Sequence, residues 1–195
     1  MELEIRKLTP ALAEEYAHFF DVTPHDVNIE EQKCYCVTWR SDASYEADGN
    51  HWFPTREERR EKAIRFVREG SLQGYLAFRD GEIVGWCNAN GDCRRCVDYL
   101  RMFWPIPAED AAVRVKSVFC FVIAPQMQRR GIATKLLEAV VRDAAAEGYD
   151  YVEAYANEVF SYEDHDFRGP VAMYEKCGFC RYAAQDGRVV MRKKL

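Results

Sequence analysis

The sequence lacks the features that would place it in several large classes of protein. No apolar run approaches the roughly 20 residues that a membrane-spanning helix needs. The opening residues, MELEIRKLTP, have neither the apolar core nor the cleavage site of a signal peptide. No internal repeat and no low-complexity tract marks a linker or a repeat architecture. These absences predict one globular domain over residues 1–195 and a cytoplasmic location.

Two common phosphate-binding motifs are also missing. No G-x-G-x-x-G opens a βαβ unit and no G-x-x-x-x-G-K-[ST] occurs, which argues against the Rossmann and Walker types of nucleotide site. An excess of positive charge is absent as well, because 27 lysines and arginines are outnumbered by 32 acidic residues, for a formal net charge of -5. A generally basic nucleic-acid-binding surface is therefore not expected, whereas a mildly acidic protein suits a cationic substrate such as an amine.

What the sequence contains is a mixed order of strands and helices. Apolar periodicity, caps and turn signals predict an α/β (α+β) fold with a mixed, mostly antiparallel central sheet flanked by helices. The expected strands are 3–9, 74–80, 82–90, 112–123, 149–157, 179–184 and 188–193, with hairpin turns at Asp80-Gly81 and Asp186-Gly187. The expected helices begin at Pro10 and cover 55–70, 131–147 and 170–177. Residues 91–110 are expected to be a loop or a short excursion, and 21–54 shows no clear pattern.

The segment 119–140, FCFVIAPQMQRRGIATKLLEAV, joins a buried strand through a turn to an amphipathic helix. A helix start offers unpaired backbone N–H groups and a positive dipole end, which together can hold a pyrophosphate. Gly131 lets phosphates approach the backbone without a Cβ in the way. Gln128, Arg129 and Arg130 add polar and cationic side chains beside it. The alternative is an ordinary amphipathic helix with a basic first turn.

The run Gln128-Arg129-Arg130-Gly131-Ile132-Ala133 resembles the Q/R-x-x-G-x-G/A signature of the GNAT acyltransferase superfamily. The resemblance includes the preceding strand with its proline and continues through YVEAYAN and AMYEKCGF to the C-terminus. The N-terminal half matches only in element order. Ala133 replaces the commoner glycine, and Arg129 sits where glycine is frequent, so its side chain must point outward or grip phosphate.

The resemblance implies acetyl-CoA as co-substrate and a division of labour along the chain. Residues 1–111 would supply mostly acceptor-side elements, and 112–195 the acetyl-CoA-binding core with the C-terminal strands. In the family, the strand that leads into the signature bends at a bulge, and one of its backbone N–H groups faces the thioester oxygen. The implied cofactor-binding residues are Phe121, Val122, Ile123, Gln128, Arg129, Arg130, Gly131, Ile132, Ala133, Thr134 and Asn157.

Acetyl transfer to an amine requires a polarised thioester, a neutral amine and a proton for the departing thiolate. The resemblance points to Tyr174 as the acid, and its reference pKa of about 10 compares with about 8.5 for a thiol; the alternative is an aromatic anchor for its helix. Period two places Glu153 and Asn157 on one strand face, so Glu153 is the first candidate base. The alternative for Glu153 is a salt-bridged sheet residue. Weaker candidates for the base are Glu158, Asp164 and His165.

The eight cysteines raise the question of a metal. Cys34-x-Cys36 and Cys93-x-x-Cys96 could offer four thiolates to zinc, with Cys87 and His51 as spare ligands. The two pairs are far apart in sequence and neither is flanked by a second C-x-x-C. Scattered reduced thiols without a metal are therefore expected. We interpret Cys120 and Cys177 as small core residues, because direct transfer needs no acyl-enzyme.

The sequence thus predicts an acetyl-CoA-dependent N-acetyltransferase that moves an acetyl group directly to a primary amine. The acceptor would be a small molecule or a peptide, the enzyme a monomer or homodimer, and neither nucleic acid nor membrane a partner. Two alternatives stay open: a non-catalytic acyl-CoA-binding or sensing domain on the same fold, and a zinc-binding, cysteine-rich regulatory module. The acceptor pocket should come from N-terminal helices and loops, near which four tryptophans fall: Trp39, Trp52, Trp86 and Trp104.

Overall fold

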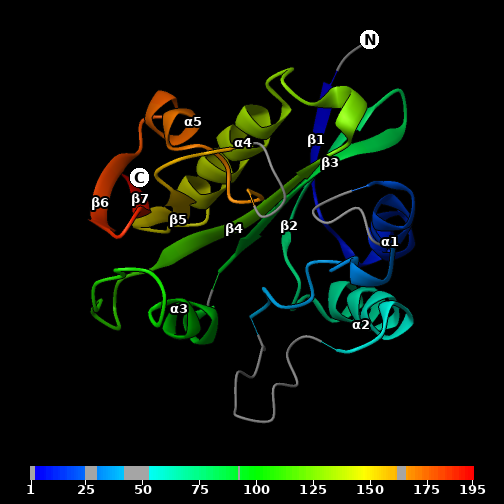
Figure 1. The fold of residues 1–195 in the computed structure, drawn as a ribbon, viewed down its shortest axis with the longest axis horizontal. Helices are drawn as coiled ribbons and strands as arrows, with labels where there is room; N and C mark the ends of the chain where they lie inside the picture. The colour runs from blue at the N-terminus through cyan, green and yellow to red at the C-terminus, as the bar shows by residue number, and fades with distance from the viewer. Residues whose placement is uncertain (1–2, 25–29, 42–52, 92, 162–165) are drawn as a thin grey trace.

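The computed structural model describes residues 3–24, 30–41, 53–91, 93–161 and 166–195. Within them, seven strands form one sheet in the order β1-β2-β3-β4-β5-β7-β6 (Figure 1). The β4–β5 pair is parallel and the other neighbours are antiparallel, which confirms the mixed, mostly antiparallel sheet. The strands are β1 (Leu3–Lys7), β2 (Gly74–Arg79), β3 (Glu82–Asn90), β4 (Val115–Ile123), β5 (Tyr151–Asn157), β6 (Cys180–Gln185) and β7 (Arg188–Lys194).

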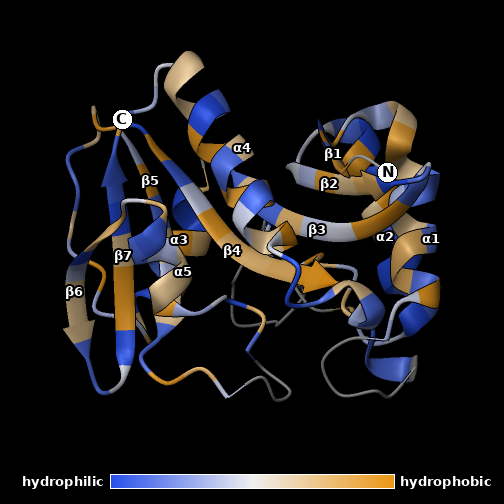
Figure 2. Cartoon of the chain, turned by 90° about the horizontal axis from the view of Figure 1, so that it is seen from above, coloured by the Kyte–Doolittle hydropathy of each residue, from blue (hydrophilic) through white to orange (hydrophobic). Residues whose placement is uncertain are grey.

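Helices cover both faces of this sheet and divide the core in two (Figures 1 and 2). The apolar residues of α1 and α2 pack on one face, and those of α4 and α5 on the other. The helices are α1 (Ala13–Val22), α2 (Arg56–Glu69), α3 (Arg94–Leu100), α4 (Ile132–Ala146) and α5 (Val171–Lys176), with short 3-10 turns at Pro10–Leu12, Glu30–Gln32 and Pro125–Met127. Within the described residues, no helix combines the length and apolarity that crossing a membrane would require.

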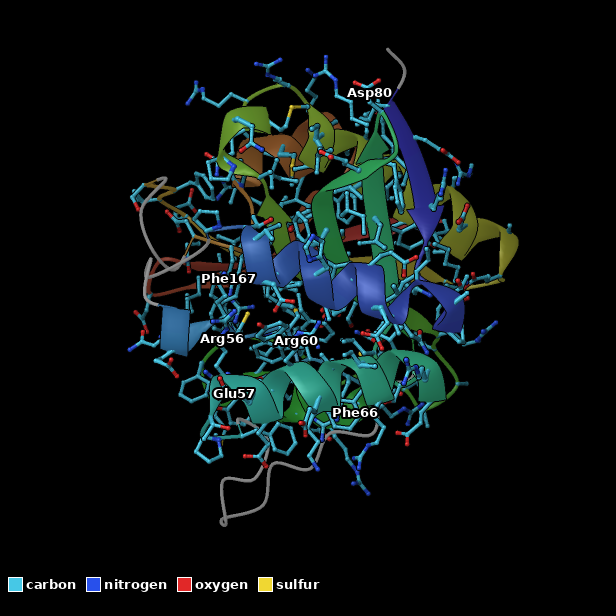
Figure 3. The ribbon with its side chains drawn as sticks, turned by 90° about the vertical axis from the view of Figure 1, so that its right-hand side faces the viewer. Arg56, Glu57, Arg60, Phe66, Asp80 and Phe167 are labelled. Atoms are coloured by element: carbon cyan, nitrogen blue, oxygen red, sulfur yellow. The ribbon has the colours of Figure 1, made fainter. Side chains whose placement is uncertain are left out.

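Local signals explain the predicted elements that the structure contains. The Thr55 hydroxyl accepts the Glu58 N–H at 3.1 Å at the start of α2, and Gly70 closes the helix at φ +77°. Charge pairs then join α2 to α1, since Arg60 and Arg56 both reach Asp21, at 2.9 and 3.8 Å. Figure 3 labels the two arginines between these helices.

The structure corrects three expectations about where elements lie. The loop expected at 91–110 contains a helix, α3, because its Cys96 and Leu100, one turn apart, are buried against the core. The strand expected from 112 begins only at Val115, since the Ala112 N–H is bonded to the Asp110 carboxylate in a turn. The strand expected from 149 begins at Tyr151.

The divergence of β4 and β5 positions the candidate site. The two strands pair only between Val115–Val118 and Tyr151–Ala154. Beyond that point β4 continues beside β3, while β5 continues beside β7. The pairing of β4 with β3 also shifts by one residue, leaving Phe119 without a partner. Such a bulge bends a strand, which confirms the bulge that the sequence resemblance implied.

Candidate functional site

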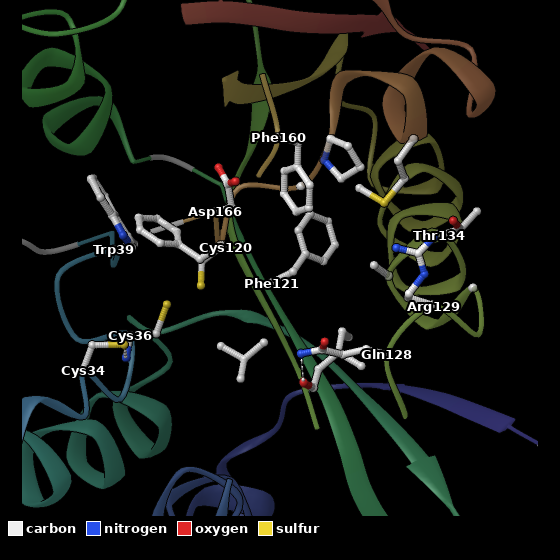
Figure 4. Close-up of a pocket in the computed structure, with 18 of the residues that line it drawn as sticks. Cys34, Cys36, Trp39, Cys120, Phe121, Gln128, Arg129, Thr134, Phe160 and Asp166 are labelled. Atoms are coloured by element: carbon white, nitrogen blue, oxygen red, sulfur yellow. Dashed lines mark hydrogen bonds between the residues drawn. The ribbon is translucent and has the colours of Figure 1, made fainter. Parts of the chain in front are cut away.

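A cavity of about 700 Å³ opens where β4 leaves β5 (Figure 4). Its walls come from parts of the chain that are far apart in sequence. They include the end of β4 (120–123), the turn and first residues of α4 (128–134), the segment 166–173 and the N-terminal segment 34–39. The cavity therefore connects the signature turn to the half of the chain where the sequence resemblance is weakest.

One end of the cavity is the start of α4. Gly131 is the N-cap at φ +78°, and nothing lies within 4 Å of where a Cβ would stand. No side chain caps the helix there, while Ala133 and Thr134 line the cavity. The Gln128 side chain donates to the Ile123 carbonyl at 3.3 Å and ties the turn to the end of β4 (Figure 4). Uncapped N–H groups at a positive dipole end form an anion site.

The middle of the cavity runs along the free edge of β4. The Phe121 N–H donates to the Phe167 carbonyl at 2.6 Å, so the segment around 167 covers part of that edge. Backbone groups alternate sides along a strand, and the N–H of Ile123 therefore points to the same open side. This edge can pair with an extended ligand as a neighbouring strand would.

The other end of the cavity gathers cysteines and aromatic rings. Cys34, Cys36 and Cys120 line it with Trp39, whose ring stacks on Phe119 at 5.1 Å between centroids. Burial alone would raise the pKa of Cys36. Hydrogen bonds from Cys120 and Asn88 and the charge of Arg168 outweigh burial and lower that pKa.

Most of the expected cofactor-binding residues share the cavity lining. The eight that do are Phe121, Val122, Ile123, Gln128, Arg129, Gly131, Ala133 and Thr134. Arg130 is exposed outside the lining, and the Ile132 side chain is buried in the core under α4. Asn157 also lies outside it, but its amide donates at 3.4 Å to Asp166, which lines the cavity.

Tyr174 lies behind the cavity wall, outside the lining. Its side chain is buried, its ring packs edge-on against Phe179, and its hydroxyl donates to the Arg168 carbonyl at 2.5 Å. Burial raises the pKa of the phenol well above its ordinary value. In this arrangement Tyr174 anchors the segment that covers β4, and its role as the acid stays a prediction.

Glu153 lies apart from the cavity. It is buried beside Arg192, with Oε2 at 2.5 Å from Nη2, and it lines a separate hollow next to α3. Burial raises the pKa of Glu153, and Arg192 opposes that rise. The placement favours the salt-bridged alternative over the base. Among the weaker candidates, Glu158 is exposed and pairs with Arg181, while Asp164 and His165 lie outside the described residues.

We expect Glu153→Gln to leave kcat for acetyl transfer within about threefold of wild type, because Glu153 lines the hollow beside α3 and not the cavity. A general base contributes about a hundredfold or more. The variant should instead lose thermal stability, since Arg192 keeps only Glu109 as a carboxylate partner. Steady-state kinetics and a melting curve measure both effects. A hundredfold loss of kcat in a folded variant would restore Glu153 as the base.

The structure also brings in Asp166, a lining residue that the sequence did not single out. Cys34 and Cys36, considered for zinc, and Trp39, expected near the acceptor pocket, line the cavity as well. Cys120, expected in the core, is almost fully buried yet belongs to the lining. Of the other tryptophans expected near the acceptor pocket, Trp86 is a core residue and Trp104 has the Arg168 guanidinium over its ring. Trp52 lies outside the described residues.

The cysteine pairs differ from a zinc site in their hydrogen bonds. Cys36 lies in a turn at φ +54°, and Cys34 lies just before that turn. Cys93 and Cys96 use their thiol protons, donating to the carbonyls of Asn90 and Arg40. Zinc ligands are thiolates. Across the described ranges, no group of three or more His, Cys, Asp or Glu is placed to hold a metal; His51 lies outside them.

We expect purified protein to carry no stoichiometric zinc, because two of the four thiols are occupied as hydrogen-bond donors. The measurement is elemental analysis after growth with zinc and dialysis against a weak chelator. A Cys93→Ser/Cys96→Ser variant is the control. Retention of one equivalent by the wild type, with its loss in the double variant, would contradict the prediction.

Comparison with known proteins agrees with this geometry. Residues 29–179 match the acetyltransferase (GNAT) family. The chain also shares its fold with a GNAT-family acetyltransferase from Streptococcus pneumoniae, at a TM-score of 0.57, 20% identity and 100% coverage of both chains. PaiA N-acetyltransferase from Thermoplasma acidophilum, solved in complex with coenzyme A, matches at a TM-score of 0.54 and 17% identity, with 100% of both chains covered. A Drosophila melanogaster polyamine N-acetyltransferase that forms N-acetylagmatine matches at a TM-score of 0.53 and 14% identity, with 100% of both chains covered. No curated protein sequence matches the chain significantly.

Proposed function

The chain belongs to the GNAT family of acetyltransferases, and we propose that it moves an acetyl group from acetyl-CoA directly to a primary amine. The observation that carries this proposal is the continuous cavity. It runs from the uncapped start of α4, along the open edge of β4, to an end lined by Trp39 and Cys36. One such cavity can hold a long phosphorylated donor and an acceptor at opposite ends.

The residues present fit acetyl-CoA as the donor. Open space above Gly131 and the helix start beside it suit a diphosphate, with the Arg129 side chain in the same wall. The β4 edge at Ile123, beyond the part that the segment around Phe167 covers, suits the extended pantetheine arm. Bound acetyl-CoA supplies the thioester, and we propose that the Ile123 N–H donates a hydrogen bond to its carbonyl oxygen, polarising it. The coenzyme A complex of the T. acidophilum protein supports this assignment.

The acceptor must present a neutral amine, because a protonated amine has no lone pair to attack with. Asp166 supplies a carboxylate to the lining, held by the Ser161 hydroxyl at 2.7 Å and by Asn157. We propose that it takes the proton, directly or through water. The acceptor is a small molecule or peptide, as for the fly protein, whose acceptors are polyamines. Residues 1–111 supply mostly the acceptor side and 112–195 the donor side, in a cytoplasmic monomer or homodimer without nucleic acid or membrane.

Thiol release from acetyl-CoA across an amine library tests this function, with calorimetry of acetyl-CoA as the companion measurement. Amine-dependent release, together with micromolar binding, is the expected result. Tight binding without release for any amine would favour the alternative, a non-catalytic acyl-CoA-binding domain. The absence of binding would remove both assignments.

A further inference from the structure

A buried arginine behind the aromatic wall of the cavity lacks the partners that a buried charge needs. Arg168 is 7% exposed and lies outside the lining itself, whereas its neighbours Phe167 and Gly169 line the cavity. Its guanidinium is packed among aromatic rings, with Cζ at 4.2 Å from the Trp104 centroid, 4.9 Å from Phe167 and 5.4 Å from Trp39. Ring faces attract a cation but leave the N–H groups around its edge without acceptors.

Among the described residues, none accepts a hydrogen bond from the Arg168 guanidinium. Nη1 is fully buried without a hydrogen-bond partner, and within the described ranges no ion pair reaches this guanidinium. The ionisable groups around it are the Cys120 thiol, the Tyr174 and Tyr155 phenols and a second cation, Arg188. Burial lowers the pKa of Arg168 to about 10, so the side chain is still charged at neutral pH.

Two other arginines with little side-chain exposure, Arg59 and Arg192, find acceptors within the chain. Arg59, 1% exposed, donates to the backbone carbonyls of Lys33, Phe53 and Glu31. Arg192 pairs with two carboxylates, those of Glu153 and Glu109. A buried charge without compensation is strongly destabilising, and an unsatisfied buried group calls for an explanation. An anionic ligand that accepts hydrogen bonds from the Arg168 guanidinium would be such an explanation.

The position of Arg168 decides which part of a ligand it would hold. Its ring partner Trp39 lines the cavity near Cys120, whereas Arg129 and Thr134 mark the opposite, phosphate-binding end (Figure 4). The anion is therefore on the acceptor and not on coenzyme A. A guanidinium group donates two parallel hydrogen bonds to the two oxygens of a carboxylate. The flat aromatic rings around it suit a small ligand.

We propose that the acceptor is a small amine that also carries a carboxylate, an amino acid, and that Arg168 binds this carboxylate while the amine faces the thioester. This inference rests on the proposed amine acetylation and narrows its substrate class. Arg168 acts in substrate recognition; Asp166, two residues earlier, keeps the role of proton acceptor.

The test compares amines that differ only in the carboxylate. Suitable pairs are phenylalanine with 2-phenylethylamine, leucine with 3-methylbutylamine, and lysine with 1,5-diaminopentane, each assayed by thiol release. The wild type should prefer the amino acid in at least one pair by tenfold or more in kcat/KM. Phosphoethanolamine against ethanolamine is a further pair, and a preference confined to the phosphate would overturn the carboxylate assignment.

Variants then connect the preference to Arg168. Arg168→Met should lower kcat/KM for the preferred amino acid by about tenfold to a hundredfold, the loss of charged hydrogen bonds. For the decarboxylated amine, kcat/KM of this variant should stay within about threefold of the wild-type value. For the amino acid, Arg168→Lys should give a kcat/KM between those of the wild type and Arg168→Met. Arg188→Met is the matched control, since Arg188 also stacks on Trp104, at 4.9 Å, but donates to the Phe103 carbonyl. Arg188→Met should keep the wild-type preference for the amino acid over the amine without the carboxylate.

A purely structural Arg168 would give a different pattern. Both members of each pair would then lose activity equally, and melting temperature would fall, whereas removal of an uncompensated charge should keep or raise it. Equal wild-type activity on both members, or a preference that survives in Arg168→Met, overturns this inference and leaves amine acetylation standing. No release with any amine overturns the proposed function and this inference with it.

Discussion

Replacing Gly131 by glutamate is expected to weaken acetyl-CoA binding by at least about tenfold, or about 1.4 kcal/mol. The new carboxylate would stand at the start of α4, where nothing lies within 4 Å of the Cβ position. That open space is where we place the diphosphate, so the substitution adds bulk and like charge at the same point. The helix dipole would also be partly neutralised by the protein's own carboxylate.

Gly187→Glu provides the matched control for this experiment. Gly187 has φ +75°, against +78° for Gly131, and its Cβ position is likewise open, but it lies in the β6–β7 turn away from the cavity. Both variants therefore carry the same cost of a left-handed backbone, about 1–2 kcal/mol. Calorimetry should show lost affinity only at Gly131. Unchanged affinity in a folded Gly131→Glu protein would remove the site from this turn.

Tyr174→Phe is expected to lower kcat by about tenfold to a thousandfold while acetyl-CoA affinity stays nearly unchanged. The reason is that a departing thiolate in an apolar cleft is stabilised by a nearby O–H mainly in the transition state. The structure adds a second expected effect, on stability. The Tyr174 hydroxyl donates to the buried Arg168 carbonyl, and leaving that acceptor unpaired costs about 1–3 kcal/mol.

Tyr155→Phe separates the two effects of the Tyr174 substitution. Tyr155 is equally buried, and its hydroxyl is hydrogen-bonded to the Ser117 hydroxyl at 3.1 Å. It should lose stability to a similar degree without the loss in kcat. If Tyr174→Phe shows lower melting temperature but wild-type turnover under chemistry-limited conditions, Tyr174 is an anchor for the cavity wall. Water or another group then protonates the sulfur.

Local chemistry decided the parts that the sequence predicts well. The turn before Gly131 and the helix after it depend on glycine, polar side chains and an apolar stripe within about five helical turns. Thr55 and Gly70 likewise set the ends of α2 through hydrogen bonds a few residues away. Such interactions need no knowledge of the rest of the chain, and for this reason the expected order of strands and helices is confirmed apart from α3.

Only the tertiary structure decided what surrounds the reacting groups. The sequence puts Glu153 on the same strand face as Asn157, but Arg192, 39 residues later, pairs with it and leaves it beside a different hollow. Local signals predict the helix that contains Tyr174. The hydrogen-bond partner of its hydroxyl, the Arg168 carbonyl, depends instead on where the 166–170 segment folds back over β4. Cys36 and Trp39 reach the cavity through contacts with Asn88 and Phe119, more than 50 residues away. The unsatisfied Nη1 of Arg168 is visible only once Trp39, Trp104 and Phe167 surround the guanidinium. Burial and hydrogen-bond satisfaction are properties of the assembled chain, because the partners come from segments whose separation along the sequence carries no periodic signal.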